Sequence, residues 1–176
     1  MCIDLGHGLT KSAEKRYVYN RTGATLTKGM LVMADIEMSD GDCDSIVPGE
    51  DGYNMINVIA CTDAKALKGH PIYCCAETIE NDKQGWVYVK SCFDPIDVQA
   101  TADANATTNV DAGDALGLVV ANNADGVEAY AAAGAIASGR ILGLAFEDAH
   151  ATVDGNIKAL FWGGDPSLGW IPDTDT

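Results

Sequence analysis

Short apolar runs recur along the chain, and Gly-rich or polar turns separate them. The clearest runs cover residues 17–19, 25–27, 30–33, 55–61, 72–79, 86–93, 139–146 and 156–162. Turn signals such as Arg21-Thr22-Gly23 and Lys83-Gln84-Gly85 separate these runs at short intervals. Short strands joined by such turns are typical of an all-β fold, so we expect a small barrel or a β-tulip-like sandwich.

The run at 86–93 alternates most clearly. Trp86 and Tyr88 fall on one predicted face of the strand, and Val87 and Val89 fall on the other. Asp154-Gly155 stands between two apolar runs and predicts a tight hairpin turn.

An Ala-rich stretch at 127–137 has the composition of a helix but not its pattern. Glycines at 126, 134 and 139 interrupt it, and no wide apolar stripe emerges at helical spacing. We therefore favour a hairpin with small side chains on its exposed face.

Charge is distributed unevenly along the chain. Residues 1–30 carry a net charge of +3, which leaves −18 on the rest of a chain whose total is −15. Residues 1–15 show no clear period and predict an extended N-terminal arm, ordered against a partner or simply frayed. We expect a folded body over residues 16–163 and an irregular tail over residues 164–176.

Composition excludes several classes of protein. A net charge of −15 repels phosphate backbones, which argues against a general nucleic-acid binder. No apolar run approaches the roughly 20 residues of a membrane helix, so we expect no membrane partner. The N-terminus lacks a basic segment followed by an apolar one, and we expect a protein made and used without export.

The six cysteines are expected to be small buried thiols rather than disulfides. Adjacent Cys74 and Cys75 would point to opposite faces of one strand. No C-x-x-C spacing occurs, which argues against zinc.

Motifs that carry chemistry are mostly missing. The sequence has no nucleophile elbow, Walker loop, dinucleotide fingerprint or H-E-x-x-H, and its three histidines are scattered. We therefore expect no enzyme and no cofactor, although a hydrolase assembled from distant residues remains an alternative. Asp40, Asp42 and Asp44 could converge on a hard cation, but Ser45 and Asp51 stand where an EF-hand needs Gly and Glu. A solvated acidic turn is the favoured interpretation.

Three tryptophans are candidates for an exposed aromatic platform that binds carbohydrate, or for core and interface anchors. They are Trp86, Trp162 and Trp170.

The order of several segments resembles the head decoration, or capsid cement, proteins of tailed bacteriophages. The segments are Arg21-Thr22-Gly23-Ala24-Thr25-Leu26-Thr27-Lys28-Gly29, Pro71 to Ile79, Gly85 to Val89, Val110-Asp111-Ala112-Gly113-Asp114-Ala115-Leu116, Gly139 to Ala145, and a closing strand to Trp162. Together they cover residues 16–163. The six cysteines and the long acidic loop at 39–51 depart from the family pattern.

The resemblance implies a β-barrel or β-tulip body, commonly a homotrimer, that binds the outside of an icosahedral shell and cements neighbouring major capsid protein subunits. The protein would be made in the host cytoplasm and lie on the capsid exterior. Such proteins often grip the shell with an N-terminal arm, and the basic residues there are our candidate contacts: Lys11, Lys15, Arg16 and Arg21. The alternative is a head-fibre or carbohydrate- or receptor-binding β-module on the virion surface.

Overall fold

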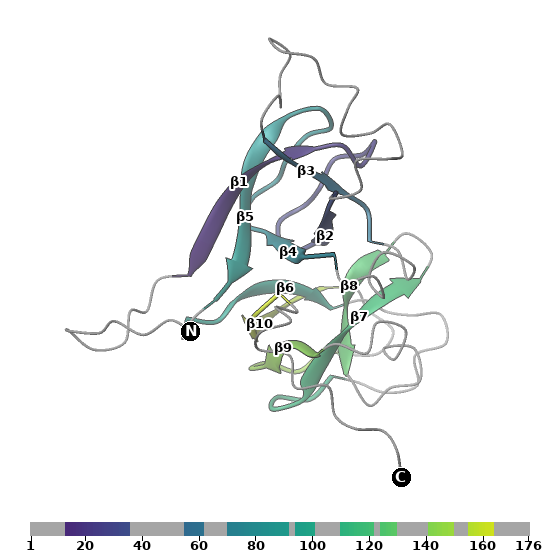
Figure 1. Cartoon of the computed structure of the whole chain (residues 1–176). Helices are drawn as coiled ribbons and strands as arrows, with labels where there is room; N and C mark the ends of the chain where they lie inside the picture. The colour runs from purple at the N-terminus through teal and green to yellow at the C-terminus, as the bar shows by residue number, and fades with distance from the viewer. Residues whose placement is uncertain are drawn as a thin grey trace, which may run out of the picture.

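A computed structural model describes eight stretches of the chain, all of them strands and their connections (Figure 1). These stretches are residues 13–35, 55–61, 70–91, 94–100, 110–121, 124–129, 141–149 and 155–163. No helix occurs within them, so the all-β prediction is confirmed.

The described residues form ten strands in two groups of five. The first group is β1 (Glu14–Asn20), β2 (Leu31–Ala34), β3 (Ile56–Ile59), β4 (Ile72–Cys75) and β5 (Gln84–Lys90). The second group is β6 (Ile96–Ala100), β7 (Ala115–Ala121), β8 (Ala124–Ala129), β9 (Ile141–Ala145) and β10 (Gly155–Phe161).

Each group closes into its own barrel, and the two barrels have the same topology. The first barrel follows the order β1-β3-β2-β4-β5 and closes where β5 pairs with β1. The second follows β6-β8-β7-β9-β10 and closes where β10 pairs with β6. In each barrel the first and third strands are parallel, and the other pairs are antiparallel. The expected single body is therefore a tandem of two equivalent barrels (Figure 1).

Register and turn geometry repeat as closely as strand order. Leu31 lies opposite Cys74 in the first barrel, and Ala115 lies opposite Leu144 in the second. The turns before β2 and β7 contain Gly29 (φ 92°) and Gly113 (φ 99°), where a left-handed backbone favours glycine.

The same backbone hydrogen bond anchors each of these turns. The Gly29 amide donates to the carbonyl of Cys75 at 2.9 Å, and the Gly113 amide donates to that of Ala145 at 2.8 Å.

A glutamate plays the same structural role in both barrels. Glu77 accepts a hydrogen bond from the Trp86 amide at 2.9 Å, and Glu147 accepts one from the Lys158 amide at 2.9 Å. Trp86 and Lys158 are therefore equivalent positions. The next residue in each strand confirms this, because Val87 pairs with Cys75 and Ala159 pairs with Ala145.

The barrels pack against each other through β2 and β4, which are buried on both faces. Cys75 and its neighbours fill the first barrel, whereas Cys74 belongs to the apolar cluster that continues into the second barrel. The opposite orientation of these adjacent cysteines is as predicted. Cys61, Cys74 and Cys75 are buried, as expected, and the other three cysteines lie outside the described residues.

The second barrel fills the same topology with a different set of side chains. Tyr73 of β4 is buried in the first barrel, and its equivalent in β9 is Gly143. Phe161 lies opposite Gly143 and is 2% exposed. The aromatic ring in the core of the second barrel therefore comes from β10, whereas the ring in the core of the first barrel comes from β4.

Several boundaries differ from those predicted. β1 begins at Glu14, so the last two residues of the expected arm belong to the first barrel. β6 was not predicted as a strand. Gly155 is the first residue of β10 and pairs with Ala100, which differs from the predicted tight Asp-Gly turn. Residues 127–129 are strand rather than helix, as predicted, and residues 130–137 and 164–176 lie outside the described residues.

We predict that Gly143→Ala destabilises the protein by about 1–3 kcal/mol, the range for overpacking a tight site. A Cβ at this position would overlap the backbone carbonyl of Leu160, which cannot swing away as a side chain could. Urea unfolding followed by circular dichroism measures the change. Gly155→Ala is the matched control, because a Cβ there meets nothing within 4 Å, and a loss as large as that of Gly143→Ala would contradict this account.

Candidate interaction surface

The outward side of strands β1 and β5 carries an exposed aromatic pair. Tyr17 and Trp86 are cross-strand neighbours, and their ring centroids lie 4.9 Å apart at an interplanar angle of 51°. They are 43% and 44% exposed, while their strand neighbours Val18 and Val87 are fully buried in the barrel. The predicted alternation is confirmed at Trp86 and Val87 and turns Trp86 towards solvent, whereas residues 88–90 are all half-buried and residues 92–93 lie outside the described residues.

Cationic and further aromatic groups extend this pair along the strands. The Lys15 ammonium lies 4.9 Å from the centroid of the Tyr88 ring, a cation–π contact. Lys90 pairs with Glu14 at 3.1 Å. We call Lys15, Tyr17, Trp86 and Tyr88 the β1–β5 face.

The four predicted contact residues fall in different places. Lys15 belongs to the β1–β5 face, and Arg16 is exposed one position along β1, where strand alternation sends its side chain to the other side. Arg21 is half-buried after the end of β1. Lys11 lies outside the described residues.

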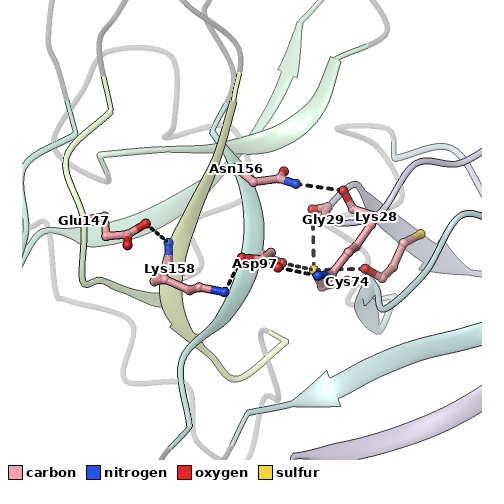
Figure 2. A network of polar contacts seen from close by, with 8 residues as sticks. Lys28, Gly29, Cys74, Asp97, Glu147, Asn156 and Lys158 are labelled. Atoms are coloured by element: carbon pink, nitrogen blue, oxygen red, sulfur yellow. Dashed lines mark hydrogen bonds and ion pairs between the residues drawn. The ribbon is translucent and has the colours of Figure 1, made fainter.

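The equivalent pair of strands in the second barrel contacts the turn at residues 27–30 of the first barrel (Figure 2). Asp97 and Lys158 are cross-strand neighbours on β6 and β10, in the positions that Tyr17 and Trp86 hold on β1 and β5. One carboxylate oxygen of Asp97 binds Lys158 at 2.5 Å, and the other binds Lys28 of the first barrel at 2.5 Å.

Backbone contacts complete this seam between the barrels. The Gly29 carbonyl accepts a hydrogen bond from the Gln99 amide at 2.9 Å, and the Lys28 carbonyl accepts one from the Asn156 side chain at 3.1 Å. The Cys74 thiol lies within hydrogen-bond distance of the Asp97 carbonyl, at 3.3 Å (Figure 2). Two backbone carbonyls and one ion pair, Lys28 with Asp97, therefore bind the turn at residues 27–30 to strands β6 and β10.

The seam shifts the pKa values of its own groups. Hydrogen bonds from Lys158 and then Lys28 hold the pKa of Asp97 below its ordinary value of 3.8. The hydrogen bond to Asp97 raises the pKa of Lys28 above 10.5. Burial between the barrels raises the pKa of the Cys74 thiol well above 9.0, which keeps it protonated and unreactive at neutral pH.

The remaining candidate chemistry is structural or lies outside the described residues. His70 is buried, and its Nδ1 lies 3.0 Å from the Ala34 carbonyl oxygen. Among the described side chains, no group of three or more His, Cys, Asp or Glu could hold a metal ion. Asp40, Asp42, Asp44, Trp170, His7 and His150 lie outside them. Within the same residues, no helix is long and apolar enough to cross a membrane.

Sequence reasoning did not find the seam or the pairing of Tyr17 with Trp86. Lys28, Asp97 and Lys158 are common surface residues that lie on three segments far apart in the chain. The only local signal was the period of two in Ile96-Asp97-Val98-Gln99-Ala100.

No protein-family model, curated protein or solved structure matched this chain.

We predict that Asp97→Asn lowers the free energy of unfolding by about 1–2 kcal/mol near neutral pH, since two partly exposed ion pairs contribute up to about 1 kcal/mol each. Because the folded pKa of Asp97 is depressed, its contribution is present above the unfolded pKa and is lost as the pH falls through the folded pKa. The difference between the variant and the wild type should therefore shrink as the pH falls below 3.8, the ordinary pKa of an aspartate.

Denaturant unfolding at several pH values measures this difference, and the exposed residue Asp94, replaced by Asn, is the matched control. A deficit in Asp97→Asn that stays constant down to acid pH would contradict the role of the charge. At the alkaline end, the Lys28 contribution is complete below 10.5 and is lost as the pH rises through its raised folded pKa.

Proposed function

We propose that this protein is a capsid decoration protein of a tailed bacteriophage, which binds the outer surface of an icosahedral head and cements neighbouring major capsid protein subunits. The ordered set of segments over residues 16–163 carries the proposal. The all-β body that such a protein requires supports it, since most of these segments fall on strands and turns of the two barrels.

The distribution of charge supports a role in binding a surface. A basic N-terminal region precedes a strongly acidic body, so one end of the chain suits an acidic partner, and the body favours solubility on a crowded particle. Cementing acts through buried contact area and requires no catalytic group and no cofactor. In this proposal the partners are the major capsid protein and other copies of the chain, as a homotrimer, on the capsid exterior.

Arg16 is the best placed of the described candidate contacts. It is exposed on β1, directly after the arm, and it leaves the strand on the side away from the aromatic pair. Lys11 would extend the same basic region towards the N-terminus. Lys15 already contacts Tyr88, and Arg21 is half-buried, so both are weaker candidates for a contact with the shell.

The exposed aromatic pair favours one alternative function, a carbohydrate- or receptor-binding module on the virion. Tyr17 and Trp86 offer two ring faces to solvent, the kind of platform on which a sugar ring stacks. The rings are tilted by 51°, so one sugar could lie flat on only one of them.

We predict that deleting residues 1–12 together with Arg16→Glu lowers occupancy on undecorated heads at least tenfold, because the variant loses the cations facing an acidic shell. The deletion stops before β1, so the barrels keep all their strands. Co-sedimentation with particles over a range of salt concentrations gives occupancy. Lys83→Glu, an exposed charge reversal at the turn before β5, is the control. Unchanged occupancy in the first variant, or an equal loss in the control, would reject the role of the basic region.

A further inference from the structure

The surface by which the second barrel receives the first occurs twice in the chain, and a described turn of the chain itself occupies part of only one of the two. On β6–β10, Asp97, Gln99 and Asn156 contact the turn at 27–30. The Asp97 side chain is 22% exposed, whereas Lys158, which pairs with Asp97, keeps 46% of its side chain exposed. The position equivalent to Asp97 is Tyr17, which is 43% exposed and carries no inserted turn from the described residues, and its cross-strand neighbour Trp86 is 44% exposed.

The inserting turn also occurs twice. Lys28 precedes Gly29, and at the same point in the second barrel Ala112 precedes Gly113. Residues 111–113 are exposed. One chain therefore carries the β6–β10 face with the turn at 27–30 docked on it. The same chain also carries the β1–β5 face, the open face, with no described turn docked on the Tyr17 and Trp86 rings, and an exposed second turn at 111–113, the unused turn.

The chemistry of each turn matches that of the face it would meet. Where the turn carries Lys28, the receiving face carries the carboxylate of Asp97. Where the turn carries Ala112, the receiving face carries the aromatic rings of Tyr17 and Trp86. A small apolar side chain suits a ring face, and a cation suits a carboxylate.

Exposed hydrophobic side chains gather at these two surfaces. The described part of the chain exposes three large hydrophobic side chains, Tyr17, Trp86 and Phe146. The first two make the open face. Phe146 follows Ala145, whose carbonyl anchors the Gly113 turn, and it is 52% exposed. All three would lose their exposure in a single contact between the open face and the unused turn.

Charge is complementary as well. Asp111 is exposed on the unused turn, and the Asp148 carboxylate accepts a hydrogen bond from the Ala112 amide at 2.8 Å, so the turn is acidic. Lys15 places a cation beside the aromatic pair on the receiving face. Opposite charges at the rim favour encounter in one orientation.

We propose that copies of this chain associate head to tail, with the turn at 110–114 and Phe146 of one copy docked on the β1–β5 face of the next. The contact repeats between chains the relation that holds the two barrels together within one chain. This proposal rests on the self-association named under the proposed function and gives it a surface, but it does not depend on binding to a capsid.

The test transplants the β6–β10 ion pair onto the open face. In the double variant Tyr17→Asp and Trp86→Lys, the first barrel acquires the ion pair that β6–β10 already carries at the same cross-strand positions. Sedimentation velocity of the full chain across a range of concentrations should show an oligomer for the wild type and at least a tenfold weaker association for the double variant. Lys83→Ser is the exposed control on the same barrel, and circular dichroism checks that each variant is folded.

Two complementation experiments make the test specific to a head-to-tail contact. Adding Ala112→Lys to the double variant recreates the Lys28–Asp97 pair between chains and should restore association. A turn variant, Ala112→Glu with Phe146→Ser, should also be monomeric. When it is mixed with the face variant, the two should form a one-to-one heterodimer, since each supplies the surface that the other lacks. The turn variant also replaces the face variant as the test if the latter fails to fold.

The proposal is overturned by a wild type that stays monomeric at all concentrations, by unchanged association in either variant, or by a mixture that does not pair. Unchanged association of the turn variant alone would indicate aromatic faces meeting each other. A monomeric wild type whose tryptophan fluorescence responds to added glycans, with no response in the Tyr17→Asp and Trp86→Lys variant, would assign the face to carbohydrate instead. Because no capsid is present in these experiments, their failure is separate from a failure of particle binding.

Discussion

The docking of the 27–30 turn on strands β6 and β10 is the contact on which the arrangement of the molecule depends. Asp97 bridges Lys28 of one barrel and Lys158 of the other, and the Gly29 carbonyl bonds directly to the Gln99 amide. The apolar residues of β2 and β4 that face the second barrel are sealed behind this seam, which explains how two thin barrels share one continuous core. Each barrel alone would leave these side chains in water.

The two barrels show how one topology accepts two different cores. Strand order, register, the turn glycine and the anchoring glutamate all recur, but the large side chain moves from Tyr73 on β4 to Phe161 on β10. The exposed pair changes too, from two rings on β1–β5 to an ion pair on β6–β10. The repeated backbone therefore provides one docking surface in two chemical forms, one used within the chain and one open to a partner.

Local pattern predicted the fold class and most strands, because burial on one face of a strand imposes a period of two, as exposed Trp86 and buried Val87 show. The tandem repeat was not predictable in the same way. A few corresponding positions of the two barrels keep their identity, such as Gly29 and Gly113 or Glu77 and Glu147, while Tyr73 and Gly143 share only a place in the register. The seam and the aromatic pair were missed because they join distant segments, and pairing across strands leaves no mark at a fixed spacing. Trp86 was one of three candidate tryptophans, and its exposure depends on which face of β5 the barrel buries.

The most direct test of the account is the number of copies of this chain on the head. Quantitative mass spectrometry of purified particles compares its amount with that of the major capsid protein. A protein that coats and cements the shell should be present at a fixed ratio close to one copy for each shell subunit. A few copies for each particle would indicate a fibre or tail component, and absence from the particles would contradict the account.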